Sequence, residues 1–162
     1  MACALGPDQP LYAMRSLNLV LDDRQSRWDL SAALGEAYYT EIAEHLHPGI
    51  FTIGGNCQSG RIAESLARMV LREGGRLNAL LCLEYAPESA FDGRVALFFG
   101  DRSWSHNPFL TETSPETRWL TSFKSVSWDI IAGNHGEYFL EANLPTFAES
   151  LRKRMRAPEA AS

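Results

Sequence analysis

Cys57 sits where a short apolar run meets a helical pattern, a position from which a side chain can do chemistry. Within IFTIGGNCQSG, residues 50–53 predict a strand, and residues 58–73 have the apolar spacing of a helix. In a nucleophile elbow the reactive side chain occupies such a strand-to-helix turn, with small residues two before and two after it. Those positions hold Gly55 and Ser59, so the spacing predicts an elbow centred on the cysteine.

An elbow would also supply the groups that a thiol nucleophile needs. It places the backbone N–H of Gln58 and the start of the helix beside the sulfur, where both favour a thiolate and a developing oxyanion. The usual motif has serine at the centre and glycine two residues later, so Cys57 and Ser59 are two departures. We predict Cys57 as nucleophile and Gln58 as oxyanion donor. The alternative is a small residue packed at a tight turn.

The same glycines also fit the spacing of a phosphate-binding loop. That motif requires Lys and Ser or Thr after its second glycine, for the phosphates and for Mg²⁺. Here Arg61 and Ile62 follow GNCQSG, which disfavours a nucleotide-binding function.

His135 is the candidate general base. It lies in the glycine-flanked segment IIAGNHGE, directly after a strand pattern and late in the chain. This agrees with the nucleophile, acid, base order of α/β hydrolases. His45 and His47 are explained as residues that end the preceding helix, and His106 is interpreted as a surface loop residue.

Two carboxylates could orient that base. Glu84 follows the strand pattern LNALLCL, and Asp101 follows RVALFFG. Either would lie at the carboxyl end of a strand and could accept the imidazole N–H. We prefer Glu84, then Asp101, and a thiol nucleophile can also work in a dyad without an acid.

The order of elements predicts one α/β domain over residues 1–162. Strands that are apolar on both faces alternate with helices, which is typical of a mostly parallel sheet with right-handed crossovers. The expected strands are Pro10–Met14, 50–53, 77–83, 95–99 and 126–131, and the expected helices are 29–46, 58–73 and 144–155.

Composition excludes several classes of protein. A net charge of −5 disfavours nucleic acid and anionic membranes as partners. The basic cluster 152–156 is interpreted as the solvated end of a last helix. No long apolar run or signal peptide is recognisable, so we expect a cytoplasmic protein. The spacing of Cys3, Cys57 and Cys82 predicts no disulfide and no zinc site, and no cofactor or metal is expected.

Taken together, these segments resemble the thioesterase domains of non-ribosomal peptide and polyketide synthases, within the α/β-hydrolase superfamily. The resemblance covers most of the chain in order. It runs through LGPDQPLY, YTEI, HPGIFTIGG, IAESLA, LLCLE and GNH. It implies that Cys57 takes the place of the nucleophile, His135 that of the base and Glu84 that of the acid. Asp101 would be the acid in the more usual hydrolase arrangement.

The departures from this family are equally specific. The family has an earlier strand and a glycine-rich oxyanion loop before the segment that resembles LGPDQPLY, and a helical lid after the acid. Here only residues 85–93 separate Glu84 from the next strand pattern. The chain is therefore expected to be a domain truncated at its amino end or a minimal relative, without the lid.

The resemblance implies a thioesterase or acyltransferase. An acyl or peptidyl chain would pass from the phosphopantetheine of a carrier protein to Cys57. The alternatives are another cysteine hydrolase of the superfamily, similar to dienelactone hydrolases, and a catalytically inactive binding domain.

Overall fold

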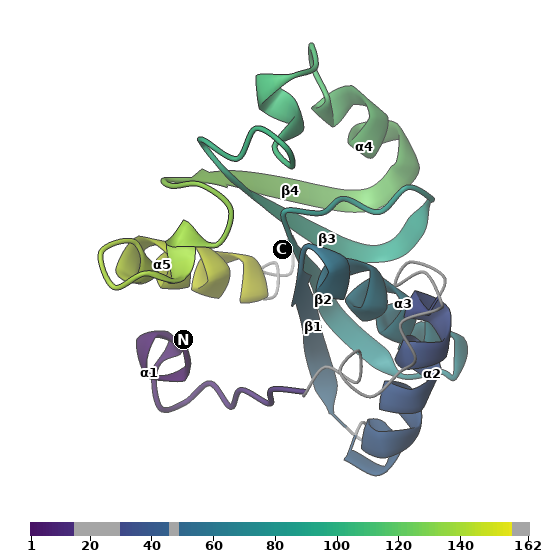
Figure 1. Cartoon of the computed structure of the whole chain (residues 1–162). Coiled ribbons are helices and arrows are strands. Elements are labelled where there is room, and N and C mark those ends of the chain that lie inside the picture. The colour runs from purple at the N-terminus through teal and green to yellow at the C-terminus, as the bar shows by residue number, and fades with distance from the viewer. Residues whose placement is uncertain (15–29, 46–48, 157–162) are drawn as a thin grey trace, which may run out of the picture.

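A parallel sheet covered by helices on both faces forms the framework of the molecule. A computed structural model of the chain describes residues 1–14, 30–45 and 49–156. The strands β1 (Ile50–Asn56), β2 (Arg76–Leu83), β3 (Phe91–Gly100) and β4 (Phe123–Ile131) lie side by side in chain order, and all three strand pairs are parallel (Figure 1). The predicted α/β fold is confirmed.

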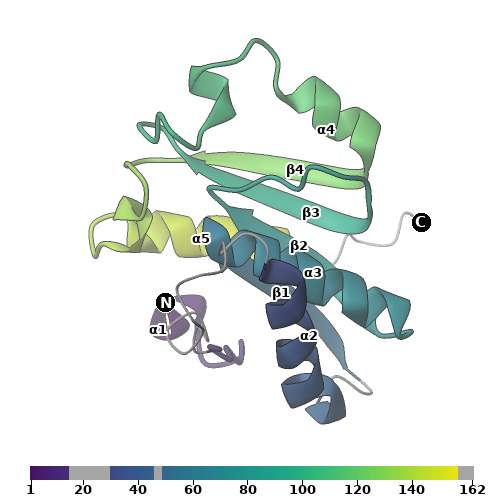
Figure 2. The same cartoon turned by 45° about the vertical axis from the view of Figure 1, so that its right-hand side comes forward.

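The helices divide between the two faces of this sheet. Helices α2 (Ser31–Ile42) and α3 (Gln58–Arg72) lie on one side, and α5 (Leu144–Met155) lies on the other with the short α1 (Ala2–Leu5) (Figures 1 and 2). Helix α4 (Glu116–Ser122) leads into β4. Short 3-10 turns occur at Ala43–His45, Pro108–Leu110 and Glu137–Phe139. No helix in the described part of the chain is long and apolar enough to span a bilayer.

Alternating side chains of the strands fill two cores. Cys82 and Leu97 point into the core that contains α2 and α3, whereas Leu81 and Phe98 point into the core that contains Phe147 of α5. Because successive strand residues face opposite sides and both sides are covered, the central strands must be apolar throughout. This explains why their sequence patterns are continuous rather than alternating.

Most of the predicted elements are present. Strands occur at 50–53, 77–83, 95–99 and 126–131, each within a longer strand, and the helices 58–73 and 144–155 are found within one residue of their expected ends. The described part of the predicted helix 29–46 forms α2 and the turn Ala43–His45. Its first residue and its last lie outside the described residues.

The prediction of a strand at Pro10–Met14 is wrong. These residues form no strand, and Leu11 and Tyr12 are 50% and 85% exposed. No strand of the described sheet pairs with the segment. Without a partner, an apolar β-prone stretch has neither ladder hydrogen bonds nor a face to bury.

The connection from β2 to β3 is unusually short for a parallel pair. Such pairs usually need a crossover of about a dozen residues or more, often a helix. Here residues 84–90 return to the start of β3 without helix, and Arg68 of α3 donates hydrogen bonds to the carbonyl oxygens of Ser89 and Ala90. As expected, residues 84–90 contain no helical lid.

The basic end of α5 is not simply solvated. The Arg154 guanidinium donates to both carboxylate oxygens of Asp129 on β4, at 2.8 and 2.7 Å. Burial alone would raise the pKa of Asp129, but the hydrogen bonds from Arg154 and Ser150 outweigh it and hold the pKa below its ordinary value. This part of the sequence interpretation is corrected, because the arginine fastens α5 to the sheet.

Candidate functional site

The segments that follow the four strands meet at one edge of the sheet. Cys57 follows β1, Glu84 follows β2, Asp101 follows β3 and the segment with His135 follows β4. The carboxyl edge of such a sheet is the usual place for a site, because side chains from several strands converge there.

The turn at Cys57 has the backbone of an elbow. Its φ is 52° and its ψ is −116°, which is strained for a residue with a side chain. The backbone N–H of Cys57 donates to the carbonyl of Leu83 at 2.7 Å, and α3 begins at the next residue, Gln58. A Cβ on Gly55 would lie 2.1 Å from the carbonyl oxygen of Ser59. The glycine is therefore needed for strand and helix to approach this closely.

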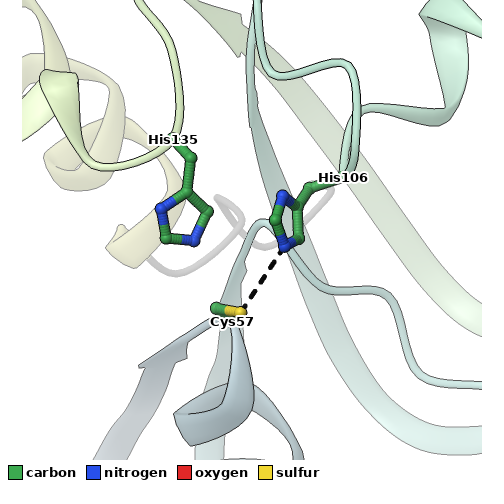
Figure 3. Close-up of side chains that lie close together, drawn as sticks. All are labelled: Cys57, His106 and His135. Atoms are coloured by element: carbon green, nitrogen blue, oxygen red, sulfur yellow. Dashed lines mark hydrogen bonds between the residues drawn. The ribbon is translucent and has the colours of Figure 1, made fainter.

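Two histidines, rather than one, flank the cysteine (Figure 3). His106 Nε2 lies 3.6 Å from the sulfur of Cys57, within hydrogen-bonding distance for sulfur, and the imidazole of His135 lies beside that of His106 above the thiol. The two ring centroids are 4.6 Å apart. The interpretation of His106 as a surface loop residue is wrong, because its side chain is half-buried against the thiol.

The segment that carries His106 is held by buried polar groups. The side-chain amide of Asn107 donates to the carbonyl of Gly100 at 2.8 Å, and the backbone N–H groups of His106 and Asn107 both donate to the carbonyl of Ser103. Asn107 is 2% exposed. His106 follows β3 just as Asp101 does, so the strand-end rule could have found it, but the polar sequence around it is also typical of an exposed loop.

The two predicted acids bind loop backbone rather than an imidazole. Glu84 is 3% exposed, its Oε1 accepts from the N–H of Gly100 at 2.8 Å, and its Oε2 is buried without a partner. Asp101 Oδ1 accepts from the N–H of Gly133 at 2.8 Å. Among the described residues neither carboxylate is hydrogen-bonded to a histidine ring. Glu84 and Asp101 thus fix the starts of the segments that carry the histidines.

Tyr138 is a further polar group at this edge, and the sequence did not single it out. Its hydroxyl donates to Asn56 Oδ1 at 2.6 Å, directly before the elbow. Burial and the negative charge of Glu84 raise the pKa of Tyr138, so the phenol stays protonated and remains a donor. It thereby ties the residue before Cys57 to the core beneath α5.

A surface hollow of about 370 Å³ lies elsewhere. It is lined by the segment 86–88 and by Trp119 and Phe123, close to the starts of β3 and β4. The starts of parallel strands are at the opposite edge from Cys57. This hollow is therefore separate from the candidate site.

Solved structures of thioesterase domains share this fold. No family model and no curated protein matches the chain. The NocB thioesterase domain, solved as a covalent complex with a fluorophosphonate nocardicin G analogue, matches with a TM-score of 0.71 at 15% identity. The match covers 93% of this chain and 85% of that one.

Two further structures extend the comparison. YbtT, a type II thioesterase of the yersiniabactin pathway, matches with a TM-score of 0.55 at 12% identity, over 75% of this chain and 72% of that one. RedJ, solved with a polyethylene glycol molecule in its active site, matches with a TM-score of 0.63 at 14% identity, over 86% and 76%. The likeness in fold to the thioesterase domains expected from the sequence is thus established.

Proposed function

We propose that the chain is a member of the synthase thioesterase family and acts as a thioesterase or acyltransferase with Cys57 as its nucleophile. The observation that carries the proposal is the thiol on a strained elbow, 3.6 Å from an imidazole nitrogen, in a fold shared with the NocB and YbtT thioesterases. A nucleophile and a base within hydrogen-bond reach form the minimal machinery of covalent acyl transfer.

The first half-reaction moves the acyl group to the enzyme. The thiol proton passes to the neighbouring imidazole, and the thiolate attacks the carbonyl carbon of the thioester. The N–H of Gln58, at the start of α3, stabilises the oxyanion. As the intermediate collapses, the bond to the pantetheine sulfur breaks and that sulfur takes the proton from the imidazolium. The products are the free pantetheine thiol and an acyl-cysteine thioester.

The second half-reaction releases the acyl group. An imidazole accepts a proton from water or an amine as that nucleophile attacks the acyl-cysteine, and the departing Cys57 thiolate recovers the proton. Residues 84–90 place no helical lid at the described edge of the sheet. Access of water favours hydrolysis, whereas a thioester intermediate also suits release by an amine.

The contact between Cys57 and a histidine in the structure and the family resemblance favour different histidines as the base. The 3.6 Å contact favours His106, and the position in chain order favours His135. For the acid we favour Glu84 over Asp101, because the buried Oε2 of Glu84 lacks a donor. Buried acceptors usually have a hydrogen-bond partner, and an imidazolium N–H would supply one.

The substrate we propose is an acyl or peptidyl chain on the phosphopantetheine arm of a carrier protein in the cytoplasm. YbtT belongs to a synthase pathway of this kind, which supports the assignment. The alternatives are a cysteine hydrolase that acts on soluble lactones and a binding domain without activity.

Intact-mass spectrometry with a panel of acyl-pantetheine thioesters tests the proposal. The wild type is expected to gain the mass of the acyl group, and Cys57→Ala is expected to lose this adduct. His106→Ala and His135→Ala should form it about 10²–10⁴-fold more slowly if the substituted residue is the base. Cys3→Ser, which changes an exposed thiol on α1, is the matched control and should react like the wild type.

The alternatives predict different results. Turnover of lactones without any reaction with thioesters would favour the dienelactone-hydrolase type. Failure to form an adduct with any acyl group, together with ordinary thiol reactivity at Cys57, would reject catalysis and favour a binding domain.

A further inference from the structure

We infer that Cys57, His106 and His135 form a binding site for Zn²⁺, which the spacing of the three cysteines along the sequence did not predict. One sulfur and two imidazole nitrogens, one ligand atom from each residue, all lie within 4.8 Å of one another. Thiolate and neutral imidazole are the donors that zinc prefers, and three protein ligands with one open position are typical of reactive zinc sites. The inference does not rest on the proposed thioesterase function.

The distances suit a tetrahedral ion. With Zn–S near 2.3 Å and Zn–N near 2.0–2.1 Å, two ligands at the tetrahedral angle are about 3.6 Å apart from sulfur to nitrogen. Cys57 Sγ and His106 Nε2 are 3.6 Å apart. A ring nitrogen of His135 lies within 4.8 Å of both other ligand atoms. The His135 side chain is exposed and its ring faces the same space above the thiol as that of His106 (Figure 3).

The segments that carry the two histidines are fastened to each other. The N–H of Arg102 donates to the carbonyl of Gly133 at 3.1 Å, and the Arg102 guanidinium pairs with Glu137 at 2.9 Å. Glu137 also accepts from the N–H of Asn134 at 2.8 Å. The backbone of both loops is therefore set before a metal arrives, and binding orders mainly two imidazole rings.

Binding would change the protonation of the thiol and its availability. Cys57 gives up its proton to solvent when the S–Zn bond forms, and each histidine binds through a neutral ring nitrogen. A sulfur that is bound to zinc is not free to attack a thioester or an alkylating agent. Zinc and an acyl group therefore compete for Cys57, and zinc would act as an inhibitor of the proposed thioesterase reaction.

The test uses the reduced full chain and Co²⁺ as a coloured substitute for Zn²⁺, without any acyl substrate. We expect one Co²⁺ per chain, with the thiolate-to-cobalt charge-transfer absorption in the near ultraviolet, and stoichiometric displacement by Zn²⁺. Cys57→Ser should abolish the charge-transfer band. His106→Ala and His135→Ala should each weaken zinc affinity at least about a hundredfold, since even changes in outer-shell partners commonly cost 10–100-fold.

Matched variants keep the test decisive. Cys3→Ser and His45→Ala remove an exposed cysteine and an exposed histidine away from the cluster, and zinc affinity should not change. His135 is exposed, so His135→Ala should remain folded, as circular dichroism can verify. Retention of the charge-transfer band in Cys57→Ser, or unchanged affinity in His135→Ala and His106→Ala, would overturn the inference. Cobalt absorption and zinc affinity are measured without enzyme activity, so they test the metal site even if the protein is not a thioesterase.

Discussion

Cys57 and Cys82 belong to neighbouring strand regions of one sheet but have opposite surroundings. Cys82 lies within β2, opposite Gly55 of β1, and has no exposed surface. Burial, and in second place the negative charge of Glu64, raise the pKa of the Cys82 thiol. Cys57 lies just beyond the end of β1, half-buried, on a strained backbone and against an imidazole.

The difference shows what makes a cysteine chemically useful in this fold. Inside a strand, the sulfur behaves as a small apolar group that fills the core, and a buried thiol of this kind is inert. One residue past a strand end, the cysteine lies at the start of α3, and its sulfur lies against an imidazole from another loop. We therefore propose that position relative to the strand end decides whether a cysteine of this sheet packs or reacts.

The largest expected effect on stability comes from Gly55→Ala, which places a new side chain at the turn between β1 and α3. The new Cβ would lie 2.1 Å from the carbonyl oxygen of Ser59, so backbone must move. We expect a loss of about 3 kcal/mol or more in the free energy of unfolding, measured by denaturant titration. Gly54→Ala is the matched control, because its Cβ would meet Leu81 at 3.1 Å, a much milder conflict. Equal stability of the two variants would contradict the close approach of Gly55 in β1 to the backbone of Ser59 in α3.

A smaller effect is expected for Cys82→Ser. The substitution keeps the size of the side chain but buries a hydroxyl in an apolar core, at a cost of about 1–3 kcal/mol. Thermal unfolding should show this loss, while acyl transfer to Cys57 stays unchanged. Cys3→Ser, at an exposed position, should change stability by less than about 0.5 kcal/mol. Loss of acyl transfer in a folded Cys82→Ser protein would contradict a purely structural role for Cys82.

The smallest effect is a gain in stability. Cys57→Gly removes the side chain from a backbone with φ of 52° and ψ of −116°, which only glycine adopts without strain. Relief of strain exceeds the added entropy of the unfolded chain, so we expect about 1 kcal/mol of added stability relative to Cys57→Ala. Both variants lack the sulfur, and chemical denaturation compares them directly. A glycine variant less stable than the alanine variant would show that the turn stores no strain.

Local patterns in the sequence predicted much of this architecture. The central strands were predictable because both faces of the sheet are covered, which makes them apolar throughout. The elbow was predictable because the small residues at Gly55 and Ser59 are close in sequence to Cys57. The strand expected at Pro10–Met14 failed, since an apolar pattern does not say whether a partner strand is present.

The histidine pair illustrates what local patterns miss. His106 reaches Cys57 across 49 residues of sequence, and its loop is placed by Asn107 and by the backbone of Gly100. The hydrogen bond from Gly100 to Glu84 likewise depends on the register of two strands. Contacts between residues so far apart in sequence arise from the assembled sheet, so the polar sequence near His106 did not indicate which residue it touches.

Site-resolved alkylation of the native protein tests whether Cys57 is an activated nucleophile. Each of Cys3, Cys57 and Cys82 would be followed by peptide mass spectrometry after brief exposure to iodoacetamide at neutral pH, with a chelator present. We predict that Cys57 reacts fastest, that exposed Cys3 reacts at an ordinary rate and that Cys82 reacts only after unfolding. The excess reactivity of Cys57 should fall in His106→Ala. A native protein in which Cys57 reacts no faster than Cys3 would contradict the assignment of Cys57 as an activated nucleophile.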